Sequence, residues 1–173
     1  MPILNTTQIA TLRTTLTPLS VEDAPFMFEL MTSPSYLRFV GDRGLASIQD
    51  TESYIASYFL KSTITQGFGY FVATNAKGAA VGTVGFMQKE YLKYPDIGFA
   101  FLPRFSGLGL AHEVSQAALG YAQDEWQLTN LDAVTDSDNV ASQNLLKRLN
   151  FKFIEEIRNP ENQQCLQLYG IRV

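Results

Sequence analysis

The chain has 173 residues, of which 46% are hydrophobic and 17% charged, and its formal net charge is −4. This balance excludes a disordered chain and suits one globular domain over residues 1–173. The negative charge and the lack of a basic run argue against nucleic acid as a partner and mildly favour a cationic substrate.

The opening third of the sequence predicts one strand and two helices. Ile9 to Leu16 is rich in threonine and predicts a strand that Pro18 closes. Ser20 and Ser47, each followed three residues later by an aspartate, have the spacing of helix caps, so each predicts a helix after it. We expect Ser33-Pro34 to end the first helix, because the residue before a proline avoids helical geometry.

The middle of the sequence predicts three antiparallel strands in series. Residues 67–88 form two strand-like runs around Asn75-Ala76-Lys77-Gly78, which has the composition of a hairpin turn. Gly82 and Gly85 interrupt the second run and indicate either a bulge or a close approach of the backbone. Asp96 to Leu102 supplies the third strand.

The last part of the sequence predicts a strand, helix, strand crossover. Apolar residues recur at helical spacing from Leu110 to Tyr121, and Leu128 to Thr135 is strand-like, so this strand is expected to pair in parallel with the strand before the helix. Asn139 to Leu149 predicts another helix, which Asn150 ends in left-handed geometry. Closing strands follow at residues 151–157 and 165–171. The predicted fold is therefore α/β, with a mixed, mostly antiparallel sheet.

A glycine-rich loop joins the third strand of that series to the helix at Leu110. A helix start has unpaired N–H groups and a partial positive charge, and glycines beside it let a ligand approach the backbone. The loop is expected to bind a diphosphate, although its spacing alone also suits a simple turn. The candidate residues are Ser106, Gly107, Leu108, Gly109, Leu110 and Ala111.

Other motifs for nucleotides and for catalysis do not fit. A P-loop needs Gly-Lys-Ser/Thr, whereas Gly109 is followed by Leu110 and Ala111. The dinucleotide fingerprint needs a third glycine at the position of His112. The chain has one histidine and one cysteine, Cys165, so we expect no disulfide, hydrolytic triad or metal site.

Two motifs in order resemble the signature of the GNAT superfamily of N-acetyltransferases. Ser106 to Ala111 follows a strand, and Asn139-Val140-Ala141-Ser142 and Leu149-Asn150-Phe151 come later at the family's spacing. The resemblance covers residues 80–155 and is to the branch that includes ribosomal-protein N-terminal acetyltransferases. Ser106 replaces the family's Gln or Arg, and Asn150 replaces its usual glycine.

This resemblance implies a GNAT fold, with helices on both faces of the sheet, and acetyl-coenzyme A bound where two neighbouring strands splay apart. It implies that residues 81–88 and 96–102 are those strands, and that the pantetheine arm pairs with backbone near Phe101 and Leu102. Asn139 and Ser142 are expected to contact the same ligand. A free N–H near Phe101 would stabilise the oxyanion as an amine attacks the thioester.

The resemblance also implies direct attack by a neutral amine, with Ser142 protonating the departing thiolate. The same serine suits a helix first turn in which it satisfies local N–H groups. Glu90 and Asp96 are the candidate bases by position, although both also suit solvated turn charges. Five aromatic residues either wall an acceptor pocket or fill the core, namely Tyr54, Tyr58, Phe59, Phe68 and Tyr70.

The function predicted from the sequence is acetyl transfer from acetyl-coenzyme A to a primary amine, preferably a protein N-terminal α-amine. The alternatives are a small-molecule amine acceptor and a non-catalytic acyl-coenzyme A binding domain. No apolar run is long enough to cross a bilayer and the first residues lack a leader pattern, so we expect a cytoplasmic protein without a membrane partner. Monomer and homodimer both remain open.

Overall fold

The computed structural model describes residues 7–173, so residues 1–6, on which the expected lack of a leader partly depends, lie outside the described part. The chain forms one mixed sheet of eight strands in the order β1-β2-β3-β4-β5-β6-β8-β7. Neighbouring strands are antiparallel except β5 and β6. The strands are β1 (Ile9–Ala10), β2 (Thr14–Pro18), β3 (Tyr70–Asn75), β4 (Ala80–Met87), β5 (Asp96–Phe101), β6 (Asn130–Asp136), β7 (Lys152–Arg158) and β8 (Cys165–Arg172).

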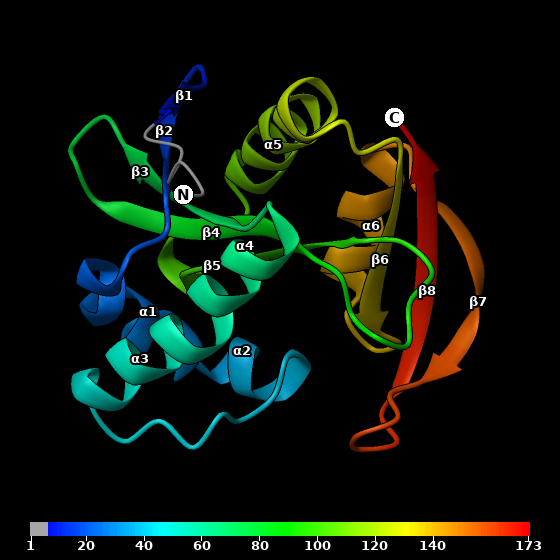
Figure 1. Cartoon of the computed structure of the whole chain (residues 1–173), viewed down its shortest axis with the longest axis horizontal. Coiled ribbons are helices and arrows are strands. Elements are labelled where there is room, and N and C mark those ends of the chain that lie inside the picture. Colours follow the sequence, from blue (N-terminus) through cyan, green and yellow to red (C-terminus); the bar gives the residue numbers. More distant parts are fainter. Residues whose placement is uncertain (1–6) are drawn as a thin grey trace.

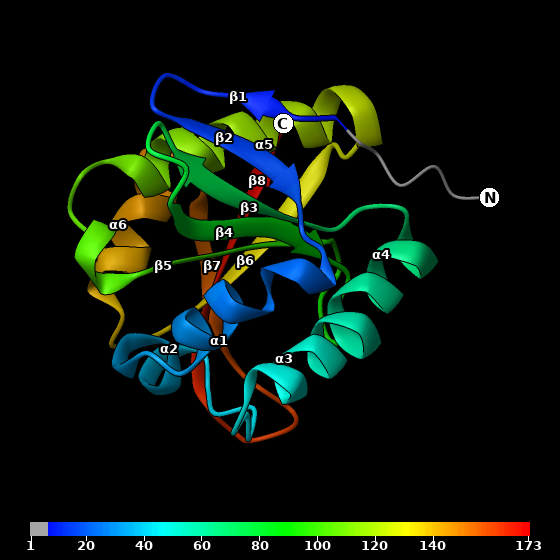
Figure 2. The same cartoon turned by 90° about the vertical axis from the view of Figure 1, so that its left-hand side faces the viewer.

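Helices cover both faces of the sheet, as predicted. Figure 2 shows α5 on one side of β2, β3 and β4, with α1, α2 and α3 on the other. The helices are α1 (Ala24–Met31), α2 (Pro34–Phe39), α3 (Ile48–Tyr54), α4 (Lys61–Gln66), α5 (Leu110–Trp126) and α6 (Val140–Arg148). Short 3-10 turns span Val21–Asp23 and Pro103–Phe105. Within residues 7–173, none of the helices has the length and apolarity needed to span a bilayer.

The amino-terminal segment differs from the prediction in two places. The predicted single strand is a hairpin of β1 and β2, because the Thr14 N–H donates to Thr11 Oγ1 at 3.0 Å and forms a local turn. Ser33-Pro34 ends α1 but also begins a further helix, α2, since proline is well suited to the first helical position.

A π-helical segment, Ile55–Leu60, joins α3 and α4 into one continuous helical rod over residues 48–66. The rod starts at Ser47, whose Oγ accepts from the Asp50 N–H at 3.0 Å, as the cap spacing predicted. It ends at Gly67, which has a φ of +84°. Such wide turns inside helices are frequent at functional sites because they change which side chains face a neighbouring cavity.

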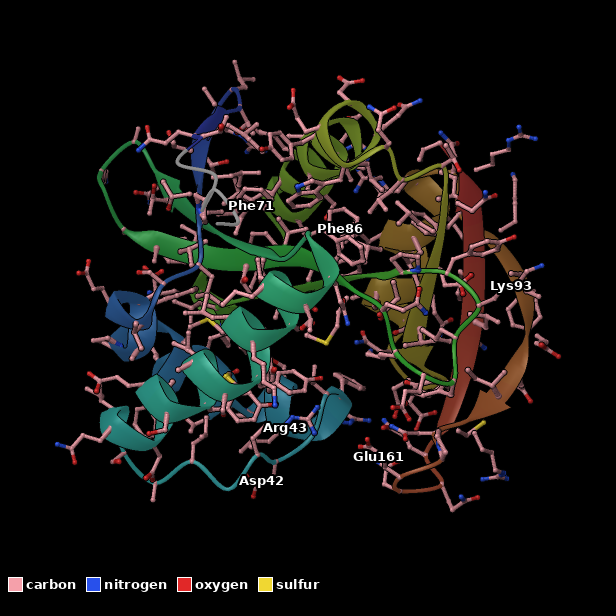
Figure 3. All side chains as sticks on the ribbon, in the orientation of Figure 1. Asp42, Arg43, Phe71, Phe86, Lys93 and Glu161 are labelled. Carbon is pink, nitrogen blue, oxygen red and sulfur yellow. The ribbon has the colours of Figure 1, made fainter. Side chains whose placement is uncertain are left out.

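Two apolar layers hold the helices against the sheet. Successive residues of β3 point to opposite faces, so Phe71 packs toward α5 while Val72 packs toward α1 and α3. Phe71 and Phe86 lie between the sheet and α5, where Trp126 stacks on Phe71 at 5.7 Å between ring centroids (Figure 3). Both layers are buried from solvent, which fixes the sheet between its two groups of helices.

The predictions for the second half of the chain are confirmed. The strands β3, β4 and β5 are antiparallel in series, and α5 connects β5 to the parallel strand β6. Asn150 follows α6 with a φ of +69°, the left-handed geometry expected there. Figure 1 shows how β6, β8 and β7 form a second part of the sheet beyond β5.

Candidate active site

The sheet opens between β5 and β6. These parallel strands are in register only at Asp96 and Asp132, where the Asp132 N–H donates to the Pro95 carbonyl at 2.9 Å. The strands β4 and β5 instead stay paired from Gly82 opposite Phe101 to Met87 opposite Asp96. The prediction that residues 81–88 and 96–102 splay apart is therefore wrong, and the opening lies one strand further along.

Backbone groups of β5 face this opening. Residues of an antiparallel strand bond alternately to the two sides. The Leu102 N–H donates to the Val81 carbonyl at 3.0 Å, so alternation turns the N–H and C=O groups of Phe99 and Phe101 toward β6. The pairing of a ligand with backbone near Phe101 and Leu102 stays a prediction, in which the groups of Phe101, and also of Phe99, face the opening, whereas the Leu102 N–H is already bonded to β4.

A cavity of about 720 Å³ runs through the opening, within the range of small-molecule sites. Phe99 and Ala100 line it from β5, and Val134 and Thr135 line it from β6. Helix α6 contributes Ser142, and its capping residue Asn139 lies beside it. The cavity therefore reaches from the start of α6, through the gap in the sheet, to the π-helical segment.

The start of α6 brings Asn139 and Ser142 together. Asn139 caps the helix, because its Oδ1 accepts from the Ser142 N–H at 3.2 Å. Ser142 is partly exposed and lines the cavity. Ser142 lies in the first turn of α6, but among residues 7–173 its hydroxyl accepts from no local N–H, so the structural alternative is not supported and the hydroxyl is available to a ligand.

The glycine-rich loop presents free backbone amides at the start of α5. Gly107 and Gly109 have φ values of +76° and +78°, in the region that favours glycine. Within residues 7–173, no acceptor binds the N–H groups of residues 107–112. The Ser106 N–H, in contrast, donates to the Pro103 carbonyl at 3.1 Å. The candidate anion-binding amides are therefore those after Ser106. Residues 107–111 stay candidates for binding a diphosphate.

Arg13 supports this loop, which the sequence did not indicate. Its Nη1 donates to the Leu108 carbonyl at 2.8 Å, and its Nε donates to Glu113 Oε2 at 2.7 Å. Glu113 Oε1 also accepts from the Thr11 hydroxyl at 2.7 Å. The β1–β2 turn thereby brings a guanidinium to a loop whose own sequence lacks a cationic side chain after Ser106. His112 lines a surface pocket together with Arg13 and Glu113, away from the opening in the sheet.

Aromatic side chains form the wall at the far end of the cavity. Tyr54 and Tyr58 stack at 5.0 Å, and Phe59 meets Tyr70 edge-on at 4.9 Å between ring centroids. All four line the cavity, and Phe59 also belongs to the buried core, against which Tyr54 and Tyr70 pack. Phe68 packs near Trp126, on the side of the core that faces α5.

Glycines in β4 and β5 make room for Tyr70. A Cβ atom at Gly85 would collide with the ring of Tyr70, and one at Gly98 would lie 2.6 Å from the Tyr70 hydroxyl oxygen. Gly82 likewise accommodates the ring of Phe101. The register between β3 and β4 shifts between the Ala73–Gly82 and Thr74–Ala80 pairs, so a bulge lies beside Gly82, whereas Gly85 lies in regular register and close approach accounts for it.

Charged groups surround the aromatic wall. Asp96 is buried and paired with Lys89, whereas Glu90 is exposed on the turn after β4. Arg43, on the segment after α2, and Glu161, on the β7–β8 loop, lie at the same end of the molecule and line the cavity (Figure 3). Burial raises the pKa of Tyr54 to about 12, although the Arg43 guanidinium opposes that rise. This tyrosine is therefore protonated at neutral pH.

The strand opening lies beside a glycine-rich helix start, and comparison with known families shows to which family this arrangement belongs. The acetyltransferase (GNAT) domain matches residues 13–152. The chain belongs to this family, and its activity is that of a GNAT acetyltransferase.

Several individual proteins are similar to this chain. An uncharacterised N-acetyltransferase of Bacillus subtilis, YoaA, is 26% identical over 154 residues, which cover 87% of this chain and 83% of that protein. A ribosomal-protein alanine acetyltransferase from Vibrio fischeri has a TM-score of 0.81 at 13% identity, covering 96% of each chain. A spermidine N-acetyltransferase chimera, in part from Vibrio cholerae, has a TM-score of 0.75 at 18% identity, covering 92% of this chain and 95% of its own.

Proposed function

We propose that this protein transfers the acetyl group of acetyl-coenzyme A to a protein N-terminal α-amine. The observation that carries the proposal is the opening between β5 and β6, which leaves β5 backbone amides and an aromatic wall in one cavity. The GNAT family uses acetyl-coenzyme A, and a structure similar to this chain, a ribosomal-protein α-N acetyltransferase, contains coenzyme A.

The acyl donor would be held mainly by main-chain groups. The free N–H groups of residues 107–111 would bind the diphosphate, aided by the positive end of the α5 dipole. The amides of Phe99 and Phe101 would pair with the pantetheine arm as an added strand pairs with a sheet edge. Asn139 would contact the same arm from the start of α6. The acetyl group would then reach the aromatic end of the cavity.

The chemistry would be direct attack of the amine on the thioester carbonyl. An N–H of β5 would stabilise the developing oxyanion, as expected for a fixed backbone amide directed at the developing charge. Ser142 would donate a proton to the departing thiolate. Glu90 and Asp96 are the candidate bases that the sequence places nearest, and both line the cavity.

The α-amine is preferred as acceptor because it is the easier amine to deprotonate. At neutral pH an α-amine requires about 1 to 1.4 kcal/mol, whereas an alkyl amine such as lysine requires about 4.6 kcal/mol. The rim formed by Arg43 and Glu161 consists of exposed residues, so a flexible peptide end could enter between them. A small-molecule amine is the second candidate, supported by the spermidine N-acetyltransferase chimera of similar fold.

An acceptor panel tests this proposal. Release of free thiol from acetyl-coenzyme A would be followed with short peptides that have a free N-terminus and no lysine. The same peptides with a blocked N-terminus and one lysine, and spermidine, would be run beside them. Turnover of the free N-terminus at least about tenfold faster, a difference of about 1.4 kcal/mol, supports the proposal. Faster turnover of spermidine would show that the small-molecule alternative is correct.

A further inference from the structure

Asp96 is buried, and only one of its two carboxylate oxygens has a side-chain partner among residues 7–173. Its side chain is 4% exposed, and its Oδ2 lies 2.9 Å from Lys89 Nζ. Its Oδ1 is buried and has no hydrogen-bond partner among residues 7–173. Buried polar atoms are nearly always satisfied, so an unpaired carboxylate oxygen indicates that a ligand supplies the missing donor.

The position of Asp96 identifies the missing donor. Asp96 lies opposite Asp132 at the last point where β5 and β6 are in register, immediately before the sheet opens. It lines the same cavity as Ser142 and the aromatic wall. A hydrogen-bond donor that enters this cavity beside the acetyl group is the nitrogen of the acceptor.

We propose that Lys89 and Asp96 together form the acceptor-amine site, in which Asp96 Oδ1 binds the incoming nitrogen and takes its proton while Lys89 orients the carboxylate. This inference rests on the proposed acetyltransferase reaction and concerns how its acceptor is bound. Asp96 is then a catalytic residue, because it touches the reacting nitrogen, and Lys89 is a positioning residue.

The reaction balances with these groups. A protonated amine enters and gives one proton to Asp96 Oδ1, and the neutral nitrogen then forms a bond to the acetyl carbon. The carbon–sulfur bond breaks, and its electron pair leaves on sulfur. The second nitrogen proton passes to that thiolate through Ser142, whose hydroxyl group gives its own proton to sulfur and takes the proton from nitrogen. Asp96 finally releases its proton to water at the cavity mouth.

Asp96 is better placed for this role than Glu90. Glu90 is exposed, so water competes for its carboxylate. Burial raises the pKa of Asp96, and the Lys89 ammonium opposes this rise. A carboxylate becomes a stronger base as its pKa approaches the working pH, provided that it remains ionised. Lys89 therefore favours the ionised form of a carboxyl group whose pKa burial raises.

Other titratable groups face Asp96 and Lys89 from β3, from β6 and from the β4–β5 turn. Burial raises the pKa of Asp132, and Lys93 on that turn opposes the rise. Asp132 on β6 raises the pKa of Asp96 by repulsion, to a smaller extent than burial. Asp96 in turn raises the pKa of Tyr70 on β3 and of Tyr91 on the turn, although burial is the larger cause for both. Both tyrosines are protonated at neutral pH, so they add no charge to the site.

The pH dependence of kcat/KM tests the proposal on the intact enzyme. Activity should rise with pH as Asp96 ionises, and Lys89→Met should move this acid limb to higher pH by about one unit or more, because an adjacent positive charge is lost. Lys89→Arg should restore the wild-type limb. Lys93→Met removes an exposed lysine on the same turn and serves as the matched control (Figure 3). The acceptor amine ionises in the same way in every assay. A difference in the acid limb between variants therefore reports a change in the ionisation of the enzyme.

Two further variants distinguish Asp96 from Glu90 as the group that takes the proton. Asp96→Asn should lower kcat/KM by about 10²-fold or more while acetyl-coenzyme A affinity, measured by calorimetry, stays near wild type. Glu90→Gln should keep the acid limb. An unshifted limb in Lys89→Met, or loss of the limb in Glu90→Gln, would overturn the inference even if Asp96→Asn failed to fold. A wild-type enzyme that acetylates no amine would instead contradict the proposed function itself.

Discussion

Replacing Gly107 by alanine separates the ligand-binding role of the loop from its conformational role. Gly107 has a φ of +76°, and nothing lies within 4 Å of the Cβ atom that alanine would add. The added methyl group would point into open space at the proposed diphosphate site. A non-glycine residue in left-handed geometry costs about 1 to 2 kcal/mol of stability. That cost is expected in any left-handed turn, with or without a ligand.

Gly78 in the β3–β4 turn provides a matched control. Its φ is +80°, it also has nothing within 4 Å of the added Cβ atom, and it belongs to a hairpin outside the proposed site. Gly78→Ala and Gly107→Ala should therefore lose the same stability, about 1 to 2 kcal/mol. Thermal unfolding followed by circular dichroism would measure both losses.

Only the Gly107 variant should lose affinity for coenzyme A. A hydrogen bond to a charged group contributes about 1.5 to 3 kcal/mol. Loss of one amide contact to the diphosphate would raise Kd by about 10- to 150-fold, since each 1.4 kcal/mol is tenfold. Isothermal titration calorimetry would measure this change. Equal Kd values for Gly107→Ala and Gly78→Ala would refute the assignment of the loop.

Three further changes test the supports of the site. Arg13→Met should cost at most about 1 kcal/mol of stability, because the Arg13 side chain is 45% exposed in its ion pair with Glu113, yet calorimetry should show weaker coenzyme A binding as the Leu108 carbonyl is released. Ser142→Ala should lower kcat in the thiol-release assay more than it lowers affinity, and equal losses would indicate a structural serine. For Glu113, burial would raise the pKa, but the hydrogen bonds from Thr11 and Arg13 outweigh it and the pKa is lowered. The stability that Glu113 provides is therefore present above the ordinary carboxyl pKa and lost as pH falls through the lowered value, so wild type but not Glu113→Gln should show this loss in acid unfolding.

Features decided by local geometry could be predicted from the sequence. The Asn75–Gly78 turn, the helix from Leu110 and the left-handed Asn150 each depend on residues that are close in the chain. The same holds for the loop at residues 106–111, where glycines precede a helix start. Backbone preference and hydrophobic spacing act over one or two turns, which is why these predictions needed no tertiary information.

Local signals also had limits near the amino terminus. The threonine-rich run predicted one strand, but the Thr11 hydroxyl forms a turn and divides it into β1 and β2. Ser33-Pro34 was expected only to end a helix, and it also begins one. Threonine and proline each favour more than one conformation, so the surrounding packing selects among them.

The sequence by itself determined the order of the elements from β3 onward and the glycine-rich helix start, because these depend on neighbours in the chain. The tertiary structure alone decided that the sheet opens between β5 and β6, that Arg13 reaches the Leu108 carbonyl, and that Lys89 pairs with Asp96. The opening lies between strands that are distant in sequence, and the Arg13 contact joins two segments that are also distant. The Lys89–Asp96 pair depends on the conformation of the connection between β4 and β5. Which side chains meet across two elements depends on strand register and packing, and no local sequence pattern encodes these.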